Sequence, residues 1–259
     1  MPDQRRSVLG RALRILDTVS DAPGGLTLSQ ISRRAGVPLT TAHRIVGELH
    51  AWGALERSPS GGYQIGLRLW ELAAVTPRSM GLRQVALPFM QDLFETTHRG
   101  VHLAIREKDQ VLFVERFTSQ ETAADRAQVG ARYELHATAI GLVLLAYAPS
   151  DVQEAALAGP LAVPDWHPPV TDRELRATLA EIRRSGYAVT SIRGEFRSVA
   201  APIYGPAGAV AAALSLILPI TEPYGPRLAH LQATTRGISR VLGSPQGRAT
   251  APAGRFRFG

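Results

Sequence analysis

Five residues on one short segment have the chemistry and the spacing needed to read DNA. Thr40, Arg44 and Gly47 fall on one side of a predicted helix, and Thr41 and His43 lie on its flanks. This side offers short donors and one long cation and has no bulky apolar group, as a helix lying in a major groove requires. Within this set, Arg44 is the candidate for direct contact with a base or a phosphate.

The elements that must position this face form a helix-turn-helix. Thr27 and Gln30 have the spacing of a capping box, which predicts the start of a first helix. Gly36 ends that helix, and Pro38 begins the next where a missing N–H costs nothing. The second helix runs to about Trp52, and its apolar residues form one stripe: Ala42, Ile45, Val46 and Leu49.

A predicted hairpin follows the second helix. Two short alternating segments, 55–57 and 63–65, flank the glycine-rich turn 58–62. A hairpin beside a recognition helix is a wing, where Arg57 and the amides of the turn can meet phosphate. Arg33, on the first helix, is a further candidate for DNA contact. The order of these parts predicts a winged helix-turn-helix and a DNA-binding transcription regulator.

Composition agrees with a polyanionic partner. The chain has 259 residues, which favours two domains, and a formal net charge of +7. Lys108 is the only lysine, so the arginine-rich composition reflects either phosphate and guanine recognition or simply a GC-rich genome. The absence of cysteine excludes disulfides and thiolate metal sites. No stretch reads as a membrane span or a signal peptide, so we expect a cytoplasmic protein without a membrane partner.

Beyond the hairpin, helical and strand patterns alternate. Two helical patterns, at about 66–75 and 78–97, are separated by Thr76-Pro77, and Pro88 is expected to kink or split the second. After Gly100 the patterns predict an α+β domain, a mostly antiparallel sheet with helices against it. The expected strands are 101–105, 111–114, 187–191, 198–203 and 209–218, and the expected helices are 139–147, 152–157, 172–185 and 224–242.

These patterns predict four consecutive regions. They are a winged helix-turn-helix DNA-binding domain over residues 1–66, a linker helix over 67–82, an α+β domain over 83–243 and a disordered tail over 244–259. The tail has no periodicity and is rich in Ala, Gly, Pro and Arg, which cannot form a packed core.

The chain resembles the IclR family of bacterial transcription regulators over nearly its whole length. In the first half the resemblance rests on segments 7–8, 11–16, 31–38 and 40–44, which include Arg33-Arg34-Ala35-Gly36-Val37-Pro38. In the second half it rests on segments 135–141, 186–189, 200–203 and 213–215, which include Leu135-His136-Ala137-Thr138-Ala139-Ile140-Gly141. No single motif decides the resemblance, but the order and spacing of the motifs are specific.

The resemblance implies a winged helix-turn-helix joined by a linker helix to a GAF-like α/β effector domain. It implies homodimers or homotetramers on palindromic double-stranded operators, with operator binding modulated by a small effector such as an organic acid or an aromatic metabolite. We expect a repressor. The implied wall of the effector pocket comprises Ala139, Ile140, Thr190, Ser198, Ser215 and Ile217.

The chain departs from the family pattern at several functional positions. Leu39 and Leu142 stand where the family often has lysine, Thr190-Ser191 where it often has two aspartates, and Ser198 where it often has cysteine. The pocket is therefore expected to be less acidic than usual and to take a neutral or anionic ligand. The amides at the start of the helix that begins with Ala139 can hold an anion.

Two arginines extend this expectation, with an ordinary alternative. Arg193 and Arg197, in the segment between Thr190 and Ser198, either clamp a carboxylate or belong to a solvated loop.

The sequence is also compatible with two other functions. The departures from the family pattern also fit a ligand-independent DNA-binding or interaction protein with a degenerate pocket. A small-molecule enzyme with a helical appendage is a remoter alternative, because no catalytic constellation appears, and we expect neither enzymatic activity nor a cofactor. His98 and His102 are four residues apart but are expected to be separated by a helix end, so they predict no joint metal site.

Overall fold

The computed structural model describes residues 7–22, 24–74, 77–118, 128–158 and 171–245. Contacts divide the chain into two compact units, Met1–Met80 and Gly81–Gly259. The predicted boundaries at residues 66, 82 and 243 remain predictions, and nearly all of the predicted tail lies outside the described residues.

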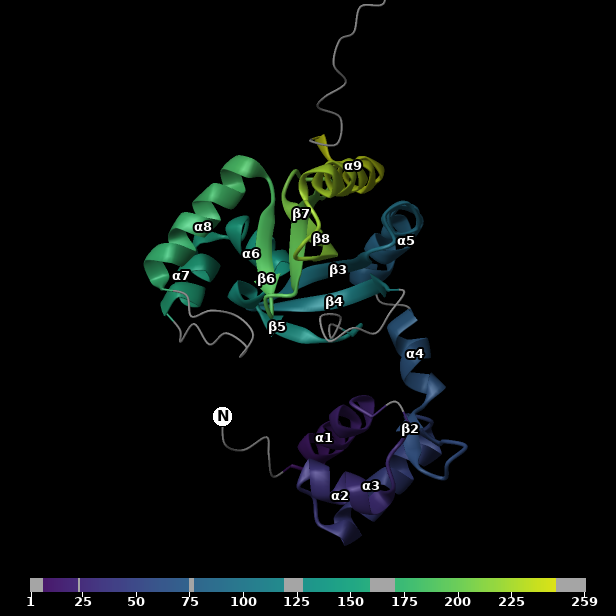
Figure 1. The fold of residues 1–259 in the computed structure, drawn as a ribbon. Helices are drawn as coiled ribbons and strands as arrows, with labels where there is room; N and C mark the ends of the chain where they lie inside the picture. The colour runs from purple at the N-terminus through teal and green to yellow at the C-terminus, as the bar shows by residue number, and fades with distance from the viewer. Residues whose placement is uncertain (1–6, 23, 75–76, 119–127, 159–170, 246–259) are drawn as a thin grey trace, which may run out of the picture. The chain divides into compact units, whose positions relative to one another are not determined.

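The N-terminal unit contains four helices and one hairpin among its described residues (Figure 1). In chain order they are α1 (Val8–Ser20), α2 (Leu28–Ala35), α3 (Leu39–Trp52), β1 (Leu55–Arg57), β2 (Tyr63–Ile65) and α4 (Leu67–Ala74). β1 and β2 pair in antiparallel fashion, and an isolated bridge adds Leu26 beside Tyr63. The predicted winged helix-turn-helix is confirmed.

The core of this unit forms where α1, α2, α3 and the hairpin meet. Each helix contributes its apolar stripe, and the hairpin contributes two side chains. The fully or nearly fully buried members include Ile15 and Val19 of α1, Ile31 of α2, Ala42, Ile45 and Val46 of α3, and Leu55 of β1. Because the stripe of α3 is buried, its opposite side must face outward.

Two glycines allow the end of α3 to pass close to the end of the wing. Gly53 ends α3 in the left-handed conformation, with φ of 87°. Gly66 follows β2, and its amide donates to the carbonyl of Ala54. A Cβ atom added to Gly66 would lie 2.2 Å from the carbonyl oxygen of Gly53, so only glycine fits this crossing.

The C-terminal unit is built on one six-stranded antiparallel sheet with the order β5-β4-β3-β8-β7-β6. Its strands are β3 (Gly100–Glu107), β4 (Gln110–Phe117), β5 (Arg132–Glu134), β6 (Ala188–Ile192), β7 (Phe196–Tyr204) and β8 (Val210–Pro219). Its helices are α5 (Pro77–Thr97), α6 (Ala139–Ala146), α7 (Ser150–Ala158), α8 (Asp172–Ser185) and α9 (Gly225–Val241), with a 3-10 turn, η1 (Leu135–Ala137), before α6.

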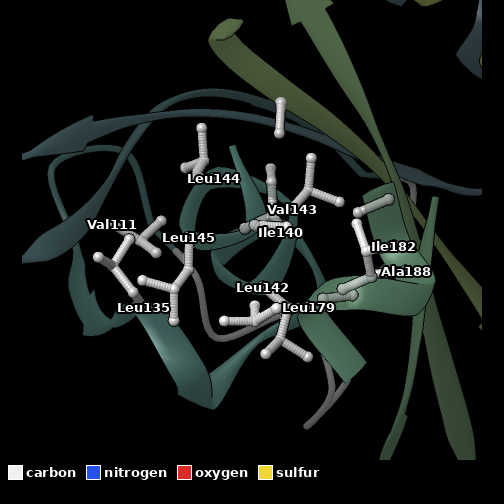
Figure 2. Close-up of a cluster of buried hydrophobic side chains, with 14 of the residues drawn as sticks. Val111, Leu135, Ile140, Leu142, Val143, Leu144, Leu145, Leu179, Ile182 and Ala188 are labelled. Carbon is white, nitrogen blue, oxygen red and sulfur yellow. The ribbon is translucent and has the colours of Figure 1, made fainter. Parts of the chain in front are cut away.

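Each face of this sheet has its own core. α6 and α8 pack on one face, where Leu142, Val143, Leu179 and Ile182 gather beside Ala188 of β6 (Figure 2). α5 and α9 pack on the other face, against alternate residues of β3, β7 and β8. The sheet with helices on both faces confirms the expected α+β, GAF-like effector domain.

α6 is buried on every side, because all eight of its residues are buried. A helix that is apolar all round belongs in a protein core.

Within the described ranges, no helix combines the length and the apolar character needed to cross a bilayer.

The structure differs from the sequence expectation at two places. The short strand β5 and the turn η1 were not predicted, because three residues are too few for a periodic signal. Of the two effects expected of Pro88, a kink or a split, the split is wrong, because α5 is continuous from Pro77 to Thr97. Burial of Ala86 and Met90 in the core on either side of Pro88 holds the helix together despite the missing N–H.

Gly66→Ala is expected to destabilise the protein by about 1–3 kcal/mol, because the new methyl group overlaps the backbone of Gly53. Gly81→Ala is the matched control, since a Cβ atom at Gly81 meets nothing within 4 Å. It is expected to be neutral or to stabilise α5 by up to about 1 kcal/mol. Urea unfolding followed by circular dichroism measures both, and equal stability of the two variants would contradict the crossing described here.

Candidate DNA-binding and effector sites

α2 is held by hydrogen bonds at both of its ends, and the second end forms the turn into α3. Thr27 and Gln30 form the predicted capping box, in which the Gln30 side chain accepts from the Thr27 amide at 2.8 Å. Gly36 has φ of 61°, the left-handed value that ends α2. The Ser32 hydroxyl then donates to the Val37 carbonyl at 2.7 Å, and the buried Val37 side chain fills the turn.

α3 presents the predicted polar face outward. Thr40, His43 and Arg44 are exposed, and Thr41 is half-buried. The Arg44 guanidinium donates to the Glu48 carboxylate at 2.6 Å, and both side chains are more than half exposed. Exposed ion pairs of this kind contribute little to stability, so a phosphate or a guanine can replace Glu48 as the partner.

The wing uses Arg57 to order its own turn. The Arg57 guanidinium lies 4.0 Å from the centre of the Tyr63 ring and donates to the Gly61 carbonyl at 2.9 Å. Two turn amides are also engaged internally, since Ser58 donates to Gly62 and Gly61 donates to Ser58. Arg57 remains exposed and close to the turn, and Arg33 is exposed on α2.

Four of the six predicted pocket residues share one face of the large sheet. Ser198 of β7 pairs with Thr190 of β6 on one side and with Ile217 of β8 on the other. Paired residues in a sheet point to the same face, and so does Ser215, two positions before Ile217. Along the strands, these residues alternate with residues that are buried in the core beneath α5 and α9. They therefore point to the opposite face of the sheet, which α6 covers.

The first two residues of α6 complete the predicted set. Thr138 caps the helix, because its hydroxyl accepts from the Gly141 amide at 3.0 Å. Ala139 and Ile140 are buried, and their amides occupy positions that a helix leaves without an internal partner. Gly141 is required here, since an added Cβ atom would lie 2.4 Å from the Leu135 carbonyl oxygen.

His102 is a residue of this face that the sequence analysis did not assign to the pocket. It pairs with Ser215 across β3 and β8, and only 2% of its surface is exposed. Its ring meets the Phe113 ring edge-on, with centroids 5.7 Å apart, and Phe113 meets Tyr133 in the same way. Side chains two positions apart on a strand point to the same face, so the buried Ala104 indicates that His102 also lies on this face.

Arg197, considered as a carboxylate clamp, lies on the opposite face from Ser198. Its guanidinium donates to the Ile220 carbonyl at 2.7 Å and lies 5.5 Å from the Tyr224 ring centre. The clamp expectation is wrong for Arg197, because one step along a strand reverses the side chain. Arg193 sits in the turn between β6 and β7 with φ of 53° and is exposed.

His98 and His102 lie on different elements of the structure. α5 ends at Thr97, so His98 lies in a turn with φ of 51° while His102 lies on β3. Among the residues that the structure describes, no group of three or more His, Asp or Glu side chains could hold a metal ion. His136 is buried in η1, before the start of α6.

Two family models match the chain. Residues 8–59 match the IclR helix-turn-helix domain, and residues 74–240 match the bacterial transcriptional regulator IclR C-terminal domain. Among curated proteins, the chain is 31% identical to the HTH-type transcriptional regulator XynR of Escherichia coli, covering 91% of this chain and 96% of the relative. It is 32% identical to the regulator BhcR of Paracoccus denitrificans, covering 90% and 85%.

A solved structure is also similar over most of the chain. It is an IclR homologue from Microbacterium hydrocarbonoxydans in complex with 4-hydroxybenzoate, with 38% sequence identity and a TM-score of 0.83. The similarity covers 91% of this chain and 99% of the solved chain.

Thr138→Ala is expected to destabilise the C-terminal unit by about 1 kcal/mol, because α6 loses its N-terminal cap. Thr138→Ser keeps the hydroxyl and is expected to retain most of this stability. Urea unfolding of the two variants distinguishes the lost hydrogen bond from the lost methyl group. Equal destabilisation by both would show that the hydroxyl has no capping role.

Proposed function

This chain belongs to the IclR family of bacterial transcription regulators, DNA-binding proteins modulated by small effectors, and we propose that it is a repressor whose effector is an aromatic carboxylate. One observation carries the choice of effector. A homologue whose similarity covers 91% of this chain was solved in complex with 4-hydroxybenzoate, and the sheet face that α6 covers here carries polar groups beside aromatic ones.

The proposed DNA-contacting residues lie on the helix-turn-helix and its wing. Arg44 reads a guanine or binds phosphate, with Thr40, Thr41 and His43 beside it on α3. Arg33 and Arg57 bind the phosphate backbone on either side, where they fix the register of α3 on the duplex.

Two copies of the chain place two recognition helices on one operator. In two-fold dimers such helices enter successive major grooves about 34 Å apart. Apolar side chains that are about half exposed or more support pairing of the N-terminal units, because a monomer gains nothing from exposing them. They are Val8, Leu9 and Leu13 of α1 and Leu67, Trp70 and Leu72 of α4.

The effector lies between α6 and the sheet face that carries Ser198 and Ser215. The hydroxyls of these serines and of Thr190 offer hydrogen bonds to a phenol or a carboxylate. The amides of Ala139 and Ile140, at the positive end of α6, favour an anion. None of these groups is a carboxylate, which agrees with an anionic ligand.

Effector and operator must affect each other equally if this binding is regulatory. If a ligand weakens operator binding by a given factor, the operator lowers the affinity for that ligand by the same factor.

We further propose that the chain is a regulator without catalytic activity, as the relatives that it matches are regulators.

Arg44→Ala is expected to weaken operator binding by about 1–3 kcal/mol, roughly five- to 150-fold, if Arg44 reads a guanine. Glu48→Gln is the matched control, because it removes the ion pair but leaves the guanidinium in place. We expect this control to bind at least as tightly as the unmodified protein. Fluorescence anisotropy with an operator selected from genomic fragments measures both, and unchanged affinity of Arg44→Ala would remove Arg44 from this role.

Ser198→Ala is expected to weaken 4-hydroxybenzoate binding about five- to tenfold, because a buried hydrogen bond to the ligand is lost. Ser191→Ala is the same substitution on the exposed opposite face of β6 and should leave binding unchanged. Calorimetric titration gives the affinities, and repeating it with operator present tests reciprocity.

Melting temperatures with 4-hydroxybenzoate and 4-hydroxybenzylamine test the sign of the ligand charge. Stabilisation by the amine alone would contradict an anionic effector, and binding of neither would favour a pocket that takes no ligand of this class.

A further inference from the structure

A large apolar side chain is exposed at the start of the recognition helix. Leu39 is the first residue of α3, and 51% of its surface is accessible to solvent. The helix ends thirteen positions later at Trp52, about 20 Å away along the helix axis. The Arg68 guanidinium of α4 lies 5.7 Å from the Trp52 ring, so α4 and its apolar surface belong to that far end.

A hydrogen bond and a packing contact of neighbouring residues hold the backbone around Leu39 in place. The Ala42 amide donates to the Pro38 carbonyl at 2.8 Å, which closes the first turn of α3. Val37, two positions earlier, is 2% exposed and anchors the turn in the core. His43 follows Leu39 by one helical turn on the same side and is also exposed. Leu39 therefore lies beside the polar face that meets DNA.

A leucine on such a surface has few possible partners, because its side chain neither donates nor accepts hydrogen bonds. Residues of the first turn of a recognition helix contact base edges. The 5-methyl group of thymine is the apolar group that base edges present in the major groove. We propose that Leu39 reads a thymine in each half of the operator through contact with this methyl group. The proposal rests on operator binding by α3.

Replacing thymine by deoxyuridine tests the contact directly, since this change removes the 5-methyl group and leaves base pairing intact. An operator is first selected from genomic fragments with the full chain. Each thymine is then replaced in turn, at the same position in both half-sites. Affinities are measured for the unmodified protein, Leu39→Ala and Leu39→Lys.

We expect one thymine position at which deoxyuridine weakens binding of the unmodified protein about three- to tenfold. Leu39→Ala should lose a similar factor on thymine DNA and show no further loss at that position. Leu39→Lys should lose the thymine preference and steepen the salt dependence of binding by about one unit of log–log slope, as a new phosphate contact does.

Two outcomes would overturn the proposal. In the first, Leu39→Ala remains as sensitive to deoxyuridine as the unmodified protein at every position. In the second, Leu39→Ala weakens binding equally on all sequences, which would indicate contact with sugar carbons. The Arg44→Ala variant separates failure of the Leu39 proposal from failure of the proposed DNA binding by α3. Normal operator binding by that variant would mean that α3 does not dock on the operator. An unchanged melting temperature of Leu39→Ala shows that the fold is intact.

Discussion

One-sided burial of α3 is the constraint on which DNA recognition depends. Ala42, Ile45 and Val46 leave water when α3 packs against α1, α2 and the wing. This burial orients the helix, because rotating it would expose the apolar stripe and bury the guanidinium of Arg44. The capping box of α2 and the glycine turn set where α3 begins. The polar face is thus oriented by what lies beneath it.

The effector domain uses a second constraint of the same kind, the alternation of side chains along its strands. Along β7, Val199 and Ala201 enter the core beneath α5 and α9, while Ser198 and Ala200 face α6. A shift of the strand register by one residue would exchange the two sets. Burial on the α5–α9 face therefore fixes which hydroxyl groups lie on the face that α6 covers.

The departures from the family pattern gain physical meaning from this arrangement. Thr190 and Ser198 are neighbours across β6 and β7, so two of the altered positions lie in the same patch of the sheet face that α6 covers. Exchange of one carboxylate and one thiol for hydroxyls makes the patch less negative but still able to form hydrogen bonds. Leu39 is a parallel case on α3, where an apolar group replaces a charged one and changes the kind of DNA contact available.

The sequence by itself determined the winged helix-turn-helix, the antiparallel sheet and the family, because caps, glycine turns and apolar periodicity act over a few residues. It also identified the exposed side of α3 before any contact was known. The tertiary structure alone decided which side chains meet across strands. His102 pairs with Ser215, and Arg197 lies beside Tyr224, on the opposite face of the sheet from Ser198. It also kept α5 continuous through Pro88. These outcomes depend on pairing and burial between distant segments, which no local pattern contains.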